Sequence, residues 1–180
     1  MRWQFDPSHT IVEASAKHMA FTTVRVNFTG TSGEIEFDPD RPAASSVRLS
    51  IPAASLESRD ERRDGHLKSP DFLDVAAHPE ISFASSKVEP AGENLFKVTG
   101  DLTIRGTPKP VTVDVFLHGV FDDQRPGKRA FIDAKVVIDR RDWGLVWNMP
   151  VPQGLLVGND VTIEFSIEAV AAPAGAGQTG

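Results

Sequence analysis

Residues 58–83 read S-R-D-E-R-R-D-G-H-L-K-S-P-D-F-L-D-V-A-A-H-P-E-I-S-F. Ser58 is followed three residues later by Glu61, which is the spacing of a capping box and predicts the start of a helix. The serine–proline pair at 69–70 predicts a second short helix, because proline suits the first helical position. We expect that helix to end at His78, since a residue before proline favours extended geometry. The stretch therefore predicts a helical excursion.

The sequence on either side of this excursion alternates between apolar and polar residues with the period of β-strands. Val24, Val26 and Phe28 share one phase, whereas Ile35 and Phe37 have the opposite phase. The phase changes at residues 30–33, G-T-S-G, where we expect a bulge or bend in one long strand over 24–38.

The pattern as a whole contains about eight strands with mostly short connections, which favours an up-and-down antiparallel barrel without free edges. The fold class predicted is therefore all-β, an eight-stranded antiparallel barrel whose helical excursion covers one end. A barrel of this size is either filled by side chains or holds one small ligand. Residues 1–170 are expected to form this single domain, and residues 171–180 (A-A-P-A-G-A-G-Q-T-G) a disordered tail.

Composition excludes several classes of function. Among the 180 residues, 25 are acidic and 19 are Lys or Arg, and the net charge of −6 argues against nucleic-acid binding and electrostatic docking to anionic lipid. Cysteine is absent, which excludes disulfides and thiolate chemistry. No apolar run approaches the roughly 20 residues needed to cross a bilayer, so we expect no stable membrane insertion. The N-terminus has no signal-peptide pattern, which predicts a cytoplasmic protein.

Catalytic and metal-binding motifs are not found in the sequence. There is no G-x-S-x-G, phosphate-binding loop or dinucleotide fingerprint, and no two histidines have the spacing of a helical ligand pair. We therefore expect no catalytic residue, no metal and no cofactor beyond a bound lipid. Asp64 and His66 would lie on different faces of a helix, which makes them a poor dyad.

The central stretch resembles the signature of the YceI-like family, a group of lipocalin-like proteins associated with polyisoprenoid binding, through R-D-G-H-L-K-S-P-D-F-L-D-V-A-A-H-P-E-I-S-F at 63–83. Other pieces follow in the family's order: Trp3 with Asp6 and His9, then His18, G-D-L-T-I-R-G at 100–106 and D-R-R-D-W-G-L-V-W-N at 139–148. The resemblance runs from Trp3 to about Glu168.

This resemblance implies a lipocalin-like barrel with a long internal pocket for an apolar chain, such as a polyprenyl lipid or a quinone tail. Many relatives carry a secretory signal and work in the periplasm, whereas this chain shows none. The family usually has bulky inward residues in its first long strand, and Ala14 and Ala16 stand there in this chain. We expect these alanines to widen part of the interior.

The candidate ligand-binding residues are inward strand positions and polar groups near the mouth. They are Val12, Ala14, Ala16, His18, Phe28, His66, Leu67, Phe72, Phe83, Val98, Leu102, Trp143 and Trp147. Arg62 or Arg63, with Arg59 and His66, either clamps a head group or pairs with neighbouring acids on a solvated helix. Trp143 and Trp147 either line the pocket or plug the barrel end.

The function predicted is binding, storage or transport of one isoprenoid-type or fatty lipid by apolar burial in the barrel. One alternative is an enzyme acting on a hydrophobic small molecule, with His18 or His66 as general base. A second alternative is a filled barrel that serves as an interaction or homodimerisation module, which predicts no cavity and an exposed apolar patch.

Overall fold

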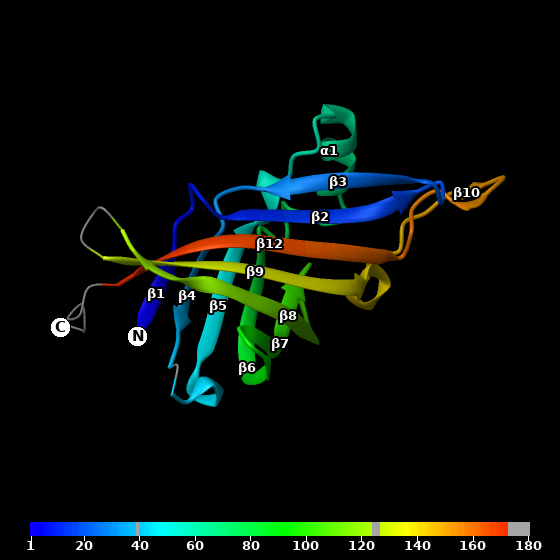
Figure 1. The fold of residues 1–180 in the computed structure, drawn as a ribbon. Coiled ribbons are helices and arrows are strands. Elements are labelled where there is room, and N and C mark those ends of the chain that lie inside the picture. The colour runs from blue at the N-terminus through cyan, green and yellow to red at the C-terminus, as the bar shows by residue number, and fades with distance from the viewer. Residues whose placement is uncertain (39, 124–126, 173–180) are drawn as a thin grey trace.

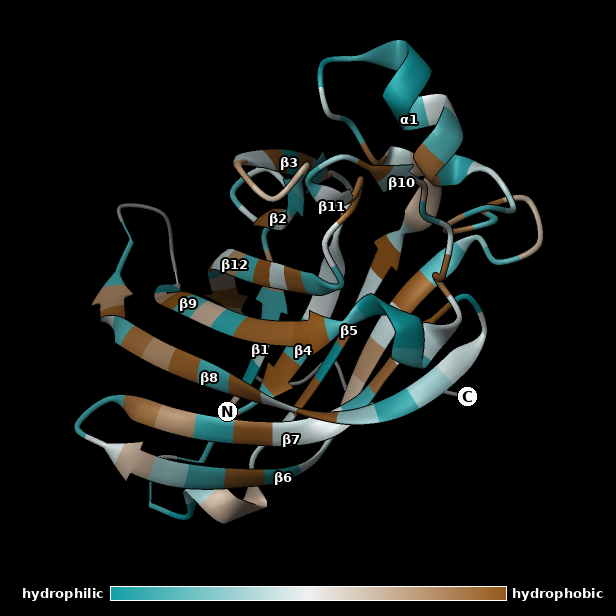
Figure 2. Ribbon diagram, turned by 90° about the vertical axis from the view of Figure 1, so that its right-hand side faces the viewer, coloured by the Kyte–Doolittle hydropathy of each residue, from teal (hydrophilic) through white to brown (hydrophobic). Residues whose placement is uncertain are grey.

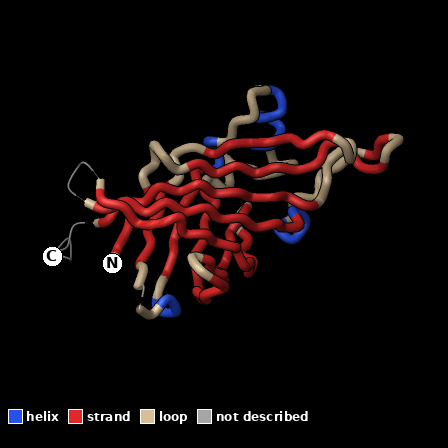
Figure 3. The backbone as a smooth tube through the Cα atoms, viewed as in Figure 1, coloured by secondary structure: helices blue, strands red, loops and turns tan. Residues whose placement is uncertain are grey.

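The computed structural model describes residues 1–38, 40–123 and 127–172. Its main strands are β1 (Arg2–Phe5), β2 (Ile11–His18), β3 (Thr22–Phe28), β4 (Ser32–Glu36), β5 (Ser46–Pro52), β6 (Glu80–Gly92), β7 (Leu95–Ile104), β8 (Thr107–Asp122), β9 (Lys128–Asp139) and β12 (Asp160–Ala171). A small hairpin consists of β10 (Pro150–Val151) and β11 (Gly154–Leu155). The described helices are α1 (Glu61–Lys68) and three 3₁₀ turns, η1 (Pro42–Ala44), η2 (Ala53–Ser55) and η3 (Arg140–Trp143). Strand is the dominant structure (Figure 3).

The main strands form one antiparallel sheet in the order β1–β4–β5–β6–β7–β8–β9–β12–β2–β3. Pairing of β1 with β12 joins the ends of the series β1, β4 to β9 and β12 into a closed eight-stranded barrel, as the sequence predicted. One edge of β12 pairs with two strands: Ala169–Ala171 pair with β1, and residues 162–166 pair with β2. The β2–β3 hairpin therefore extends the wall beyond the closed ring (Figure 1).

The far edge of β3 is almost unpaired. Within the described residues it meets the opposite wall through the bridge between Asn27 and Glu57, in which each backbone amide donates to the other residue's carbonyl at 2.9 Å. Helix α1 stands over the side of the molecule where β3 lies (Figure 1). The barrel is thus closed by backbone pairing at one end and covered by a helical segment at the other.

The single bent strand predicted over 24–38 is wrong. β3 ends at Phe28 and β4 begins at Ser32, and the two strands lie at different places in the sheet order. Gly30 adopts a left-handed conformation (φ 69°), and the Thr31 side chain is fully buried between the strands. The change of phase at 30–33 marks the end of one strand and the start of another, because the chain leaves one part of the wall for another.

The helical excursion is also shorter than predicted. The cap of α1 is Asp60, whose side chain accepts a hydrogen bond from the Arg63 amide at 3.1 Å, and Ser58 does not form the predicted capping box. Arg59 has a left-handed backbone (φ 64°), so the chain changes direction between Ser58 and the N-cap residue Asp60. Residues 69–78 form turns rather than a second helix.

These turns fold back on the end of α1. The Leu73 amide donates to the carbonyl of Leu67, and the Val75 amide donates to that of Lys68, both at 3.0 Å. The turns bury Phe72 and Leu73 while α1 itself buries no residue. Hydropathy colouring shows the same contrast, with a largely hydrophilic α1 above a barrel of alternating strands (Figure 2).

Alternation along the strands places apolar residues inside, in one continuous core. The inward row of β12 contains Val161, Ile163, Phe165 and Ile167, and it runs from the covered end toward the closed end. Ala171, which the sequence assigned to the tail, is the last residue of β12 and pairs with Trp3. The rest of the predicted tail from residue 173 lies outside the described residues.

Candidate functional site

The largest described cavity lies at the covered end of the barrel and has a volume of about 790 Å³. We call it the outer cavity. The β2–β3 hairpin, α1 with the turn after it, the segment leading to and from β10–β11, and the start of β12 supply its walls. Its lining residues are Ala14, Ser15, Ala16, Lys17, His18, Val24, Val26, Phe28, Asp60, Arg62, Arg63, His66, Leu67, Phe72, Leu73, Arg140, Leu145, Trp147, Leu156, Val157 and Val161.

A second, smaller cavity of about 120 Å³ lies deeper in the closed barrel, and we call it the inner cavity. Its lining is apolar except for Ser45. Large aromatic side chains, among them Phe5, Phe83, Phe96 and Phe165, fill most of this part of the interior. The long internal pocket implied by the family resemblance is therefore reduced to a wide outer part and a narrow inner part.

The two cavities follow one another along the same strand. Val161 lines the outer cavity, and the next inward residue of β12, Ile163, lines the inner cavity. Inward residues of a strand are two positions apart, which corresponds to about 7 Å. The two cavities are therefore neighbours along β12.

A compact hydrogen-bond cluster fixes α1 over the outer cavity. The guanidinium of Arg63 donates to the Ser58 hydroxyl at 2.8 Å and to the Ser58 carbonyl at 2.9 Å. The Ser58 amide and hydroxyl donate to the carboxylate of Asp64. Partial burial raises the pKa of Asp64, but these bonds from Ser58 outweigh it and hold the pKa below its ordinary value. Ser58 is thus an anchor for the helix rather than its cap.

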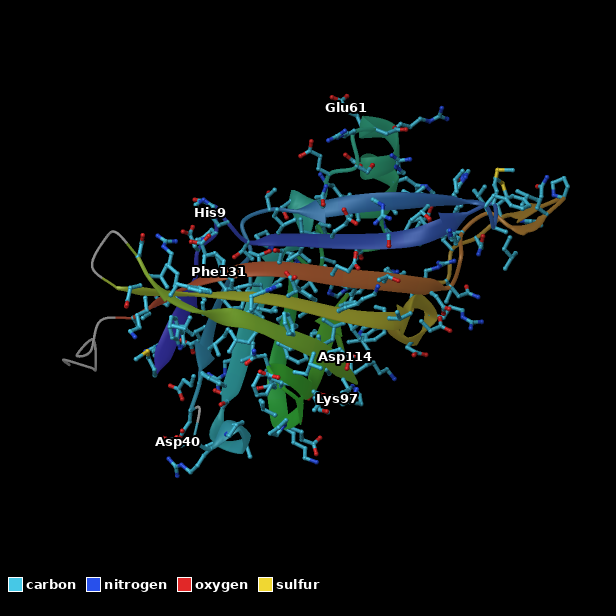
Figure 4. The ribbon with its side chains drawn as sticks, in the orientation of Figure 1. His9, Asp40, Glu61, Lys97, Asp114 and Phe131 are labelled. Carbon is cyan, nitrogen blue, oxygen red and sulfur yellow. The ribbon has the colours of Figure 1, made fainter. Side chains whose placement is uncertain are left out.

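Within the described residues, no hydrogen bond or ion pair joins the guanidinium groups of this segment's arginines to the acids beside them. Arg63 is held by Ser58, and Arg59 lies before the helix rather than on it. Arg62 lines the outer cavity and makes no hydrogen bond or ion pair to the part of the chain that the structure describes. Glu61, its neighbour in the first turn, points away from the barrel at the outer end of α1 (Figure 4). Arg62 is therefore a cation available at the cavity wall.

His66 belongs to an aromatic group in the same wall. Its Nε2 lies 2.9 Å from a carboxylate oxygen of Asp71, which orients the ring. The ring packs edge-on against Trp147, with centroids 4.5 Å apart, and against Phe72 at 5.1 Å. His66 was expected near the mouth, but its fixing by Asp71 was not predicted, because Asp71 was assigned to a second helix.

Arg140 organises the opposite wall and was not among the predicted site residues. This buried guanidinium donates to the carbonyls of Gly158 at 2.9 Å and Trp147 at 3.0 Å, and it also reaches the carbonyl of Leu145. Burial lowers the pKa of Arg140 from its ordinary value. The segment D-R-R-D-W at 139–143 indicated that an arginine could belong to the site. It did not indicate which of the two adjacent arginines points inward, because that depends on the 3₁₀ turn η3.

The two tryptophans of that segment have different roles. Trp147 is half-buried and lines the outer cavity. Trp143 is fully packed, donates from its indole nitrogen to the Leu102 carbonyl at 2.9 Å, and lines neither cavity. Trp143 therefore ties η3 to β7 from within the packed core.

The predicted ligand-binding residues separate into three groups. The outer cavity brings together Ala14, Ala16, His18, Phe28, His66, Leu67, Phe72 and Trp147. The inner cavity is lined by Phe83, Val98 and Leu102. Val12 and Trp143 line neither, because both are packed in the core, Val12 at 1% exposure.

A cluster of acidic residues lies at the closed end. Ligand atoms of Asp6, His9 and Glu168 all lie within 4.8 Å of one another. The guanidinium of Arg129 bonds to both carboxylates and to Asp123, so a protein cation already pairs with the group. Hydrogen bonds from His9 and Arg129 lower the pKa of Asp6 to about 2. The cluster ties β9 and β12 to the loop after β1.

No helix in the described ranges is both long and apolar enough to span a membrane.

Comparisons with known proteins agree with this architecture. The family model for the YceI-like domain matches residues 3–169. Protein YceI of Escherichia coli is 34% identical over 163 residues, covering 90% of this chain and 82% of the relative. A UPF0312 protein of Pseudomonas syringae pv. tomato is 33% identical over 156 residues, covering 87% of this chain and 80% of the relative.

Solved structures show the same fold. BcnA of Burkholderia cenocepacia superposes with a TM-score of 0.77 at 27% identity, over 93% of this chain and 99% of its own. A polyisoprenoid-binding domain from Saccharophagus degradans superposes with a TM-score of 0.71 at 15% identity, over 94% of this chain and 98% of its own, which shows the fold alone. On the family match and the relatives' identity over most of both chains, this protein belongs to the YceI-like family.

Proposed function

We propose that this protein binds one amphiphilic lipid with an isoprenoid-type or fatty chain and serves as a carrier or store for it. The observation that carries the proposal is the outer cavity, whose volume of about 790 Å³ falls in the range of roughly 300–1,000 Å³ typical of small-molecule sites. Its apolar wall would solvate a chain without any catalytic group. The polyisoprenoid-binding domain with the same fold points to the same ligand class.

The lipid's chain would lie along the alanine side of the cavity. The small side chains of Ala14 and Ala16 line the same cavity as the aromatic pair of Phe72 and Trp147. An apolar cavity of about 150 Å³ holds a benzene-sized molecule, so the inner cavity of about 120 Å³ accommodates only the end of a chain. A ligand longer than this must keep most of its length in the outer cavity.

The polar head would lie by Arg62. Its guanidinium is unpaired within the described residues and lines the cavity, whereas the other cations of the lining already have partners: Arg63 with Ser58, Lys17 with Thr23, and Arg140 with backbone carbonyls. An arginine forms strong paired hydrogen bonds with phosphate or carboxylate oxygens. We therefore assign the ligand an anionic or strongly polar head.

The two alternative functions find less support. An enzyme would need a substrate held at His18 or His66 and a group that supports either histidine as a base. The ring of His66 contacts Asp71, Phe72 and Trp147, and the ring of His18 has no hydrogen-bond partner among the described residues. A filled interaction module needs an interior without space, whereas the outer cavity is large. Binding within the cavity is the function that the geometry favours.

Native mass spectrometry tests the proposal with farnesol and farnesyl phosphate as probes. We expect one molecule bound per chain, with farnesyl phosphate bound more tightly. Arg62→Ala should lower the affinity for farnesyl phosphate about tenfold, the value of one charge-assisted contact, and leave farnesol unaffected. Arg25→Ala is the matched control, because Arg25 of β3 already pairs with Glu13 of β2. An apo mass with no uptake of either probe would favour the filled interaction module.

A further inference from the structure

An apolar tip projects from the barrel beside the outer cavity. It consists of the β2–β3 turn with Met19, Ala20 and Phe21, of Met149 just before β10, and of Leu155 in β11. The hairpin reaches furthest from the body of the molecule and lies next to the β2–β3 turn (Figure 1). Two segments distant in sequence thus meet at one end of the fold.

Hydrogen bonds hold the two parts of the tip together. The Met19 amide donates to the Leu156 carbonyl at 2.8 Å, and the Leu156 amide donates to the Met149 carbonyl at 2.9 Å. A β-bridge between His18 and Val157 continues the contact. The tip is therefore one built surface rather than two independent loops.

The tip exposes large apolar side chains. Phe21 is 76% exposed, Leu155 is 52% exposed and Met149 is 49% exposed. The surrounding sequence contains no acidic residue, lysine or arginine over 18–24 and 143–159, although 24% of the chain is charged. Lys17 borders this region, and its ammonium donates to the Thr23 hydroxyl at 2.9 Å. Large exposed apolar side chains with so few charges beside them are characteristic of a surface that contacts another apolar phase.

The turn that presents Phe21 has an unfavourable sequence for its shape. Met19 and Ala20 both have left-handed backbones, with φ of 51° and 66°, as in a type I′ hairpin turn. Asn and Gly are the residues that adopt this conformation at low cost. Met19 and Ala20 make this turn less stable than Asn and Gly would. The cost indicates that the apolar side chains of the turn are retained for a function rather than for folding.

The tip adjoins the outer cavity directly. His18, Leu156 and Val157 line the cavity, and each is bonded to or next to a tip residue. An apolar ligand moving between the tip and the cavity would pass along these residues rather than through water. This placement relates the tip to ligand entry.

We propose that the apolar tip docks on the surface of a zwitterionic lipid bilayer, with Phe21, Met149 and Leu155 in the interfacial region and the outer cavity facing the membrane. The exchange of lipid between bilayer and cavity rests on the function proposed above, whereas the docking itself does not. Apolar side chains without charges suit this phase, because membrane-surface affinity grows with buried apolar area. The net charge of −6 makes an uncharged lipid surface a better partner than an anionic one.

Flotation with phosphatidylcholine vesicles tests the docking. The wild-type chain should bind these vesicles without added ligand and bind more weakly as phosphatidylserine replaces phosphatidylcholine. The double variant Phe21→Asp/Leu155→Asp should lower vesicle binding by about tenfold or more, since each side chain contributes at least that factor when buried. Thermal melting establishes that the variant is folded.

The matched control is Phe121→Asp. Phe121 is 56% exposed on β8, and the strand ends at the opposite end of the barrel from the tip (Figure 1). This variant should bind vesicles as the wild type does. Equal losses for the tip and control variants, or no wild-type binding to phosphatidylcholine, would overturn the proposal.

Sedimentation of the same proteins separates the remaining outcomes. If the wild type is a dimer that the tip variant converts to a monomer, the tip is an interface between copies and the membrane proposal is wrong. Uptake of farnesol without vesicles, measured by native mass spectrometry, should be the same in tip variant and wild type. Vesicle binding without farnesol uptake would leave the docking standing and refute the proposed ligand instead.

Discussion

The two ends of the barrel are closed by different means. At one end, β1 pairs with both β4 and β12, so the backbone forms a continuous ring around aromatic side chains. At the other end, β12 pairs with the β2–β3 hairpin, whose far edge meets the opposite wall at the bridge between Asn27 and Glu57. The interior is nearly filled where the ring is complete, and it is hollow where helix α1 replaces the missing strand pairing.

This difference shows how one sheet supports both stability and binding. Packing of large side chains in a closed ring removes apolar area from water and stabilises the fold. At the other end, the sheet does not close and α1 covers the opening, although α1 buries no residue of its own. The space beneath α1 has walls that are held by polar contacts such as those of Ser58 and Arg140. Substitutions in the two regions should therefore have different consequences.

The largest expected effect is on the filled end. Phe83→Ala removes a buried aromatic side chain from the inner cavity wall and should lower the free energy of unfolding by about 3–5 kcal/mol, measured by urea denaturation. The space released should also admit a longer chain, so geranylgeraniol should gain affinity relative to farnesol. Loss of stability without this shift in chain preference would mean that the ligand does not reach the inner cavity.

The next effect concerns the wall of the hollow end. Arg140→Met leaves three carbonyls in and around the core without this donor and should cost about 3 kcal/mol of unfolding free energy, together with loss of farnesol binding. Arg141→Met is the control, because Arg141 forms a surface pair with Asp139 and such pairs contribute about 0–1 kcal/mol. Equal effects of the two substitutions would contradict the structural role of Arg140.

A smaller effect is expected from filling the outer cavity. Ala14→Phe places a ring in the space beside Ala16 and should weaken geranylgeraniol binding about tenfold while leaving geraniol nearly unaffected. Ala84→Phe is the matched control, since Ala84 is exposed on β6. Competition between chain lengths in native mass spectrometry provides the measurement. Unchanged preference in the Ala14 variant would remove the alanines from the binding wall.

The smallest effect is the pH dependence of the filled end. The pKa of Asp6 is lowered to about 2 from its ordinary value of 3.8, so ionised Asp6 stabilises the fold at pH values above 3.8, and that contribution disappears as the pH falls through 2. Wild type should melt at a higher temperature than Asp6→Asn at pH 5, and the difference should shrink by pH 2. A difference that stays constant over this range would show that the carboxylate's charge has no part in it.

The fold class was predictable because it depends on features that repeat along the chain. Period-2 alternation in about eight segments gave the closed eight-stranded barrel, and the motifs at 63–83, 100–106 and 139–148 gave the family. The break between β3 and β4 was not predictable from alternation. A change of phase at Gly30 looks the same whether a strand bends or the chain moves to another part of the sheet.

The site was predicted less completely, because its walls depend on contacts between distant segments. Ala14, Phe72 and Trp147 were identified as inward candidates, and the structure places them around one cavity. Arg140 could not be assigned, since its partners are carbonyls of residues 145–158 that carry no side-chain signal. Val12, two positions before Ala14 on β2, lies in the packed core and lines neither cavity, which alternation along the strand alone does not distinguish.

Trp147 gives the protein a built-in optical reporter. The chain has three tryptophans and no tyrosine, and Trp3 and Trp143 are shielded in the core. Trp147 alone of the three lines the outer cavity, with its ring against the imidazole of His66. Occupancy of the cavity would change the polarity around this indole, so the emission wavelength should follow ligand uptake in an unlabelled sample.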